Sequence, residues 1–496
     1  MAHFSGIDTA VLVLYFALTM GFGFASASKS STVEGFTAAR RSVSGWLTGL
    51  SILGSFVSSI SFLGYTGKAY AGNWNAYVWC FSMPIATAVA AKYFVPFYRR
   101  LGSVSAYENL ERHFGLWARI YADICYLLTQ IARVASVAYL MALPMSVLLG
   151  WNIYAVILFT GIAVVVYSFV GGIIAVIWTE AVQTLVLLVG AFACAAILTF
   201  SVPDGFSGIV STAAANGKFS LGSFDIFDFA SSTFFVVLIN GLFINLQNFG
   251  IDQNYVQRYI TAKSDTEAVK GLWINGLVYI PLSAVFFYIG TALFCYYGAF
   301  PELLPAEYAQ GRADYVFAYF MVSQLPVGFK GLLIAAVFAA AMSTISGSLN
   351  SSATILLTDI FRRFSKASGH RREMAVLKIS TVAVGSAGIL IALALAYAKP
   401  ANALDVWWTL SGIFSGGMLG LFLMTFSLRF TPKVAAVSVG VGIVCIALTT
   451  FCDGNMLPLE IPVHKFMIPA MGTCAILAAG FLLSIASGRK KQRFDS

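Results

Sequence analysis

The chain has 496 residues, of which 59% are hydrophobic and only 10% are charged, and its mean hydropathy is +0.83. Soluble domains carry about 25% charged residues, so this composition argues against a soluble enzyme or binding module. The formal net charge of +9 is explained by orientation in a membrane, and no nucleic-acid partner is needed. We expect one integral membrane domain over 1–496.

Apolar runs of the length that crosses a bilayer, about 20 residues of helix each, follow one another along the chain. Backbone polar groups in lipid must be satisfied within the segment, so these runs predict helices, whereas a β-barrel would show short alternating segments. We predict an all-α polytopic protein with about thirteen spans, at 7–27, 45–66, 74–97, 117–147, 152–170, 174–200, 232–256, 272–299, 327–359, 376–397, 404–428, 434–452 and 465–487.

The basic residues predict an orientation. Most of the 30 Lys and Arg residues, Arg258 among them, fall in loops that are internal if the N-terminus lies outside and the C-terminus inside. This is the bias expected of cytoplasmic loops. The exceptions are Arg133, within a span, and the residues expected outside, which are Lys68, Lys218, Arg312, Lys330, Lys399 and Lys465. No basic region precedes the first span, so we expect no cleaved signal peptide.

Signatures of several other chemistries are missing from the sequence. The seven cysteines show no CxxC or zinc spacing, and all four histidines lie in loops or near the termini. There is no Walker motif, HExxH or Ser/His pair placed for catalysis. We therefore expect neither an ATP-driven pump nor an intramembrane enzyme, and a channel and a proton-coupled carrier stay as alternatives.

Three spans are unusually rich in small and polar residues, at 49–64, 240–254 and 339–352. Close packing between helices would explain them. Alternatively, an unwound turn frees carbonyls and hydroxyls, the oxygen ligands that a hard cation such as Na⁺ prefers. The second and seventh spans are five apart, as expected for matching helices of two repeats. This predicts a 5+5 inverted repeat, with a peripheral helix at 7–27, repeats at 45–200 and 232–428, and two further helices at 434–487.

Two ionisable residues, Arg133 and Glu180, lie within spans. A charge near the bilayer centre costs at least ~2.5–3.5 kcal/mol, so it normally faces a partner or a cavity. Arg133 could pair with Glu180 or another acid, or it could clamp the carboxylate of a solute through two parallel bonds. Glu180 could be a cation ligand or an acid that reaches the membrane interface.

Four motifs now resemble one known family. They are Ser343-Thr344-Ile345-Ser346 in the ninth span, Gly171 to Glu180 entering the sixth, Tyr107-Glu108 with Arg112-His113 in a loop, and Gln257-Arg258-Tyr259 after the seventh span. Together they resemble the solute:sodium symporter family over nearly the whole chain, which implies the leucine-transporter-type fold. Ser58-Ser59-Ile60-Ser61, Lys68-Ala69-Tyr70 and Arg133-Val134-Ala135 are most similar to the bacterial sodium/sialic acid symporters.

The resemblance implies that sodium is the coupling ion. Its main site would use the carbonyls of Gly54, Val57 and Ala340 and the hydroxyls of Ser343 and Thr344. Positions 340, 343 and 344 share one face of a helix. A second site would involve Ser343, Ser346 and an acid of the sixth span. Here Glu180 stands in place of the usual Asp, and Gly347 in place of a serine, so we expect one sodium, with two as the alternative.

The resemblance also implies a solute pocket that contains Ser58, Ser61, Arg133, Asn245 and Gln247. Arg133 would hold a carboxylate, so the expected solute is a small acid such as sialic acid. Two residues depart from the sialic acid carriers: Phe56 replaces a small hydroxylated residue, and Cys80 replaces Gln. Both make the pocket less polar, which favours the rival, a neutral sugar, polyol or amino acid. We expect a multi-pass protein of a bacterial inner membrane that works as a monomer.

Overall fold

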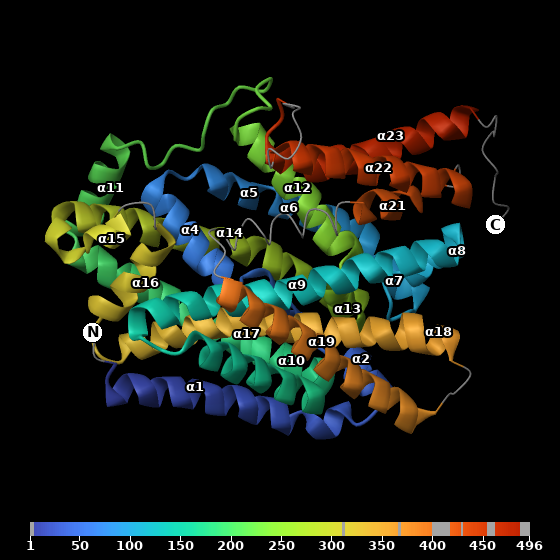
Figure 1. Ribbon diagram of the computed structural model, residues 1–496, viewed down its shortest axis with the longest axis horizontal. Coiled ribbons are helices and arrows are strands. Elements are labelled where there is room, and N and C mark those ends of the chain that lie inside the picture. The colour runs from blue at the N-terminus through green and yellow to red at the C-terminus, as the bar shows by residue number, and fades with distance from the viewer. Residues whose placement is uncertain are drawn as a thin grey trace.

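The computed structural model describes residues 4–309, 313–365, 369–398, 417–427, 430–453 and 462–486. These residues are helical apart from their connections and an isolated bridge between Val43 and Ala262. Figure 1 shows long helices lying side by side, many of them roughly along the longest axis of the molecule. Within the described ranges, 10 helices are long and apolar enough to cross a membrane, and one bent pair would make an eleventh.

The second predicted span is a broken helix. Helix α3 (Gly45–Phe56) ends at Val57, whose φ of −88° and ψ of 105° are extended, and α4 (Ser59–Ala71) begins after Ser58. The two segments are bent by 56°. The carbonyls of the last turn of α3 therefore have no partner further along the same helix. The unwound turn expected in this span is confirmed.

The seventh predicted span is also interrupted. Helix α12 (Phe234–Ile251) ends at Asp252, and α13 (Gln253–Thr261) follows it. All nine residues of α13 are buried although most are polar. Hydrogen bonds make this burial possible: Gln257 Nε2 donates to Asn350 Oδ1 at 3.0 Å and to Thr354 Oγ1 at 2.9 Å. Arg258, expected in an internal loop, is instead fully buried, so that assignment was wrong.

Gly172 separates the fifth and sixth predicted spans, which the structure joins as α10 (Ile153–Ser201). Its φ of 52° and ψ of −154° break the helical backbone, and only glycine adopts such angles without strain. A Cβ at this position would also lie 2.7 Å from Phe36 Cγ.

Helix α17 (Phe329–Ile355) lies at the centre of the protein, and every residue from 333 to 355 is buried. It packs against α10, α9 (Leu116–Leu149), α1 (Gly6–Ala25) and α19 (His370–Ala398). The first half of α17 is apolar, and the buried hydroxyls of its second half donate hydrogen bonds, for example Ser348 to Gln130 and Thr354 to the carbonyl of Asn350. The remaining long elements are η3 to α7 over Asn75–Leu101, α14 (Asp265–Ala299), α22 (Pro432–Asp453) and α23 (Ile468–Ala486). Most of the predicted span 404–428 lies outside the described residues, which include only α21 (Met418–Met424) from it.

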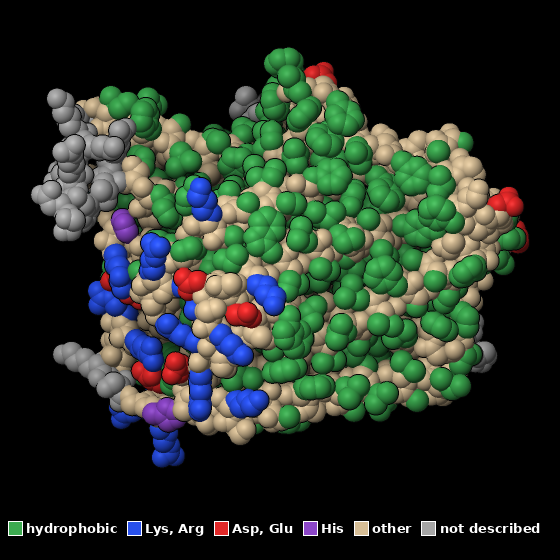
Figure 2. All heavy atoms as spheres, turned by 180° about the vertical axis from the view of Figure 1, so that it is seen from behind, with side chains coloured by type: hydrophobic (Ala, Val, Ile, Leu, Met, Phe, Trp, Pro, Cys, Tyr) green, Lys and Arg blue, Asp and Glu red, His purple; other side chains and the backbone are tan. Residues whose placement is uncertain are grey.

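Basic side chains gather at one end of the molecule. Figure 2 shows them beside a broad hydrophobic surface, at the end where Figure 1 places α8 (Glu108–Phe114) and α18 (Arg362–Phe364). Exposed cations of this region's elements include Arg112, Arg362 and Arg363. We call this the basic end. The hydrophobic remainder of this surface suits contact with lipid.

Candidate functional site

The five oxygens expected to bind sodium come from the break after α3 and from the middle of α17. Ser343 Oγ donates to the carbonyl of Gly54 at 2.8 Å, which joins the two elements directly. Ser343 Oγ also lies 3.2 Å from the carbonyl of Ala340, and Thr344 Oγ1 donates to the same carbonyl at 3.1 Å. Val57 supplies the extended residue at which α3 ends.

This set of oxygens fits a sodium ion chemically. Carbonyls and hydroxyls are hard, neutral ligands, and here the hydroxyls of Ser343 and Thr344 lie at hydrogen-bond distances from the carbonyls of Gly54 and Ala340, respectively. A neutral set holds a monovalent cation without the strong electrostatic trapping that carboxylates would add. The residues are buried, with Ser343 at 1% and Thr344 at 4% exposure, so the site lies away from bulk water.

Glu180, considered for a second sodium site, lies in a dense hydrogen-bonded cluster. Its Oε1 contacts Arg258 Nη2 at 2.5 Å and accepts from Ser55 Oγ at 2.9 Å, and its Oε2 accepts from Ser51 Oγ. Both charged side chains are 0% exposed. Arg258 is therefore the acid's partner, and the pairing of Glu180 with Arg133 considered from the sequence is wrong.

Gly347 allows this cluster to approach α17. A Cβ there would lie 2.7 Å from Asn254 Oδ1 and 3.1 Å from Arg258 Nη2. The serine expected from the family pattern would therefore meet α13 directly. Ser346 donates to the carbonyl of Ser343 at 3.0 Å and is buried in the same helix.

The acid that faces Arg133 is Asp252, at the break between α12 and α13. Arg133 Nη2 lies 3.5 Å from Asp252 Oδ2, and the two side chains are 15% and 10% exposed. Asp252 Oδ1 also accepts from the backbone N–H of Asn254 at 2.8 Å, which caps α13. The role of Asp252 was not predicted, although a lone acid between two polar helical segments is a usable signal.

Ser58 and Ser61 begin α4, which packs against the Arg133-bearing α9. Their hydroxyl oxygens lie 3.5 Å apart, and Ser58 Oγ accepts from the N–H of Ser61 at 3.4 Å. Both residues are partly exposed. Ser58 therefore caps α4, in addition to being a candidate solute ligand.

Phe56 lies in an aromatic cluster beside these serines. Its ring centroid is 4.8 Å from that of Tyr255, 5.5 Å from Phe249, 5.6 Å from Tyr279 and 6.5 Å from Trp79. These rings come from α13, α12, α14 and α5 (Val78–Phe81). The cluster makes this side of the candidate pocket aromatic.

The other candidate solute residues lie on α5 and α12, which pack together. Cys80 is fully buried in the hydrophobic core. Asn245 Nδ2 donates to Ser82 Oγ at 2.9 Å, and its Oδ1 has no partner among the described residues. Gln247 is half-buried. Asn245 therefore contacts the residue before α6 (Met83–Val89), while Gln247 lies one half-turn away on the same helix.

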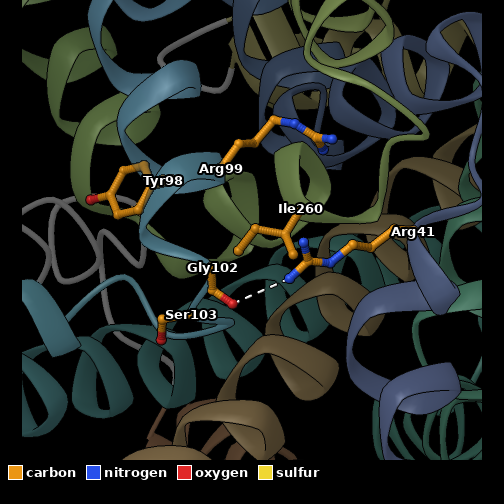
Figure 3. Close-up of a pocket in the computed structure, with 6 residues that line it drawn as sticks. All are labelled: Arg41, Tyr98, Arg99, Gly102, Ser103 and Ile260. Atoms are coloured by element: carbon orange, nitrogen blue, oxygen red, sulfur yellow. Dashed lines mark hydrogen bonds between the residues drawn. The ribbon is translucent and has the colours of Figure 1, made fainter.

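A shallow surface depression at the basic end is separate from these residues. Figure 3 shows Arg41, Tyr98, Arg99, Gly102, Ser103 and Ile260 around it. Arg41 Nη2 donates to the carbonyl of Gly102 at 3.2 Å. Arg99 Nη1 donates to the carbonyls of Tyr259 and Ala262 at 2.8 and 3.0 Å. These cations hold loops together, and none of the candidate solute residues lines the depression.

Residues 36–442 match the sodium:solute symporter family. The chain belongs to this family. It is 32% identical to the sodium/sialic acid symporter SiaT of Proteus mirabilis over 99% of this chain and 97% of the relative. The symporter also superimposes on a Na⁺-coupled sialic acid symporter solved in a substrate-bound outward-open state, with a TM-score of 0.90, 30% identity and coverage of 99% and 100%.

The nucleobase-cation transporter Mhp1 in a closed conformation shares the fold alone, with a TM-score of 0.56 and 16% identity over 91% of this chain and 95% of that one. The fold is therefore the leucine-transporter type with an inverted repeat, as the resemblance implied. Sodium is the coupling ion of this symporter, which is a multi-pass cell-membrane protein and not an enzyme. The boundaries of the repeats and the individual ligand residues stay predictions.

Proposed function

We propose that this symporter imports a carboxylate-bearing solute with one sodium ion, and that sialic acid (N-acetylneuraminate) is the first solute to test. The observation that carries the proposal is the position of Arg133, in the middle of α9 at the level of the broken helices, with Asp252 3.5 Å away. Similarity to sialic acid symporters over nearly the full length supports the same solute. Orientation follows from charge: the basic end faces the cytoplasm.

Arg133 and Asp252 explain how an anion would be recognised. A guanidinium offers two parallel donors to a carboxylate, whereas the 3.5 Å contact with Asp252 is long for a hydrogen bond. A solute carboxylate would therefore compete with Asp252 for the same donors. Ser58 and Ser61 would bind the solute's hydroxyl groups, and the Phe56 cluster would pack against its less polar face.

One sodium is favoured over two because Glu180 is already neutralised by Arg258. The main site then uses Gly54, Val57, Ala340, Ser343 and Thr344. Sodium supplies a positive charge there that stabilises the freed carbonyls of α3 against α17. Since coupling between two ligands is reciprocal, fixing this break also favours solute binding at Ser58 and Ser61, directly after it.

The test is uptake of radiolabelled N-acetylneuraminate into proteoliposomes with sodium or choline outside. We expect sodium-dependent uptake by the wild type and none by Arg133→Ala. Arg133→Lys keeps the charge but loses the two-pronged geometry, so KM should rise about 10- to 100-fold, the equivalent of ~1.5–3 kcal/mol. Arg363→Lys, at an exposed ion pair with Glu111, is the matched control and should leave KM unchanged.

A neutral solute is the second candidate, favoured by the aromatic surroundings of Phe56 and the burial of Cys80. Neutral sugars, polyols and proline belong in the same uptake panel. Normal sodium-dependent uptake of one of these neutral solutes by Arg133→Ala would mean that Arg133 has a structural role. We also propose that one chain suffices for transport, as a monomer in a bacterial inner membrane.

A further inference from the structure

A polar seam runs through the protein from Arg133 to the basic end. Polar side chains recur along α9 at intervals of four and three residues, which places them on one face of the helix. They are Arg119, Asp123, Tyr126 and Gln130, which are buried, and Arg133, whose side chain is 15% exposed. This face meets α17 and η6 (Leu356–Phe361) through hydrogen bonds: Tyr126 with Ser351 at 2.7 Å, Gln130 with Ser348 at 2.7 Å, and Arg119 with Asp359 at 2.7 Å.

Asp123 is the member of this seam without a partner. Its exposure is 0%, and neither carboxylate oxygen has a hydrogen-bond donor among the described residues. Asp123 lies one turn along α9 from Arg119, whose Nη2 contacts Asp359 Oδ1 at 2.7 Å, and Asp359 is also 0% exposed. An ionised carboxyl group is an acceptor only, so two neighbouring buried acids can share a hydrogen bond only if one of them carries a proton.

The two acids differ in their surroundings. Asp359 Oδ2 accepts from Ser105 Oγ at 2.5 Å, and its Oδ1 accepts from Arg119 Nη2 at 2.7 Å and from Thr358 Oγ1 at 2.6 Å. These donors stabilise Asp359 as a carboxylate. Asp123 has none of them, and it is the acid whose ionised form would be uncompensated.

The other charged groups around Asp123 do not compensate the charge that its ionised form would carry. Glu111 on α8 lies 2.6 Å from Arg119 Nη1, so it shares that guanidinium with Asp359. Glu111 also pairs with the exposed Arg363 of α18 at 2.9 Å. Tyr107, in the loop before α8, is a further titratable group of this region: its ring centroid lies 5.7 Å from that of Tyr126, and its hydroxyl is buried without a partner in the described structure. Like charges and burial both disfavour a further carboxylate here.

We propose that Asp123 is a proton-binding site. Its carboxyl group donates a hydrogen bond to the neighbouring Asp359 while the polar face of α9 is packed against α17 and η6, which we call the closed seam. A sodium ion would suit this place less well, because the guanidinium of Arg119 beside Asp359 repels a second cation. A proton needs only the carboxyl group of Asp123 and a neighbouring acceptor. The described residues also hold no group of three or more His, Cys, Asp or Glu side chains that could bind a metal ion.

The site makes the closed seam sensitive to pH at the cytoplasmic end. An uncharged Asp123 can stay buried without a donor, whereas an ionised Asp123 needs water around it, so a low cytoplasmic pH favours the closed seam. As the pH rises, Asp123 ionises most readily where water reaches it, and the open seam is favoured. The inference concerns this chain's own gating and does not depend on which solute is carried.

Infrared difference spectroscopy of the purified protein tests the proposal without any solute. The stretch of a protonated carboxyl group should be present at neutral pH and should be lost in Asp123→Asn, which keeps the shape and can still donate to Asp359. Asp265→Asn, on an exposed acid paired with Arg99, is the matched control and should retain the band. A band that survives in Asp123→Asn would overturn the proposal. So would a band that disappears when sodium is added at constant pH, because sodium would then be the ligand.

Transport gives the second measurement. The rate of sodium-driven uptake by wild-type proteoliposomes should change as the internal pH is varied from about 6 to about 9, and the rate of Asp123→Asn should not. Equal pH profiles for the two proteins would contradict the gating role. The two proposals can fail separately. If Asp123→Asn lost the carboxyl band but the wild type showed no sodium-dependent uptake of any solute, the proton site would stand and the proposed function would be refuted.

Discussion

At the residue scale, we expect the function of this symporter to depend on a few polar side chains. Each needs a hydrogen-bond or ion-pair partner because it lies within the membrane. Ser343 and Thr344 illustrate this, because each hydroxyl already contacts a carbonyl of the predicted sodium site. The same oxygens can bind a cation when their lone pairs face inward. We therefore expect each hydroxyl to have two roles, in helix contact and in ion binding.

Thr344→Val should weaken sodium binding with little change in packing. The substitution removes one of five ligand oxygens, so the apparent sodium affinity measured from uptake should fall about 10- to 100-fold, or ~1.5–3 kcal/mol. Thr381→Val is the matched control, because Thr381 also bonds to the carbonyl four residues earlier, Leu377, at 2.9 Å, but lies on the peripheral α19. An unchanged sodium dependence in Thr344→Val would show that the site is elsewhere.

Prediction from sequence at this scale depended on whether a residue's partner could be inferred. Arg133 and Glu180 stood out because charges are rare within apolar spans. Their partners, Asp252 and Arg258, lie in the seventh span and just beyond it, and no local pattern links positions more than 70 residues apart. The hydropathy of Gln253–Thr261 is typical of a loop, and only tertiary hydrogen bonds make its burial favourable.

At the element scale, two broken helices meet at one ion pair. Arg258 on α13 contacts Ser51 and Ser55 of α3 at 2.8 and 2.7 Å, in addition to Glu180 of α10. Ser55 directly follows Gly54, a predicted sodium ligand. The pair therefore fixes the half-helix α3 against both α10 and α13 at the point where its carbonyls become available.

Glu180→Gln should destabilise the protein strongly. It leaves Arg258 buried without a counter-charge, which costs about 3–5 kcal/mol, and the thermal unfolding temperature in detergent should fall accordingly. The double variant Glu180→Gln with Arg258→Gln should recover part of the loss, because neither charge remains. Asp265→Asn breaks an exposed pair, worth about 0–1 kcal/mol, and is the control. If Glu180→Gln and Asp265→Asn unfolded at the same temperature, the buried ion pair would not be what holds α3 in place.

At the scale of the whole molecule, the number of sodium ions decides how the membrane potential acts. One sodium carried with a monovalent carboxylate moves no net charge. A second sodium would add one charge, on which 100 mV performs about 2.3 kcal/mol of work, equivalent to roughly fiftyfold in accumulation. The single-sodium proposal thus predicts electroneutral transport.

Accumulation of the labelled acid at equilibrium should therefore be the same with and without an inside-negative potassium diffusion potential set by valinomycin. Valinomycin with equal potassium on both sides serves as the control for the ionophore. An increase of about fiftyfold on imposing 100 mV would mean two sodium ions, and would return Glu180 and Ser346 to consideration as ligands.

The sequence by itself determined that this is an all-helical membrane protein, which family it belongs to, and that its second span is broken. These properties follow from composition, from apolar runs of membrane-spanning length and from local motifs, all of which act over short stretches of chain. Only the tertiary structure decided that Arg258 is buried against Glu180, that Asp252 faces Arg133 and that Asp123 is buried without a donor among the described residues. The physical reason is that a buried charge is tolerated only beside a suitable partner, and that partner is set by how distant helices pack.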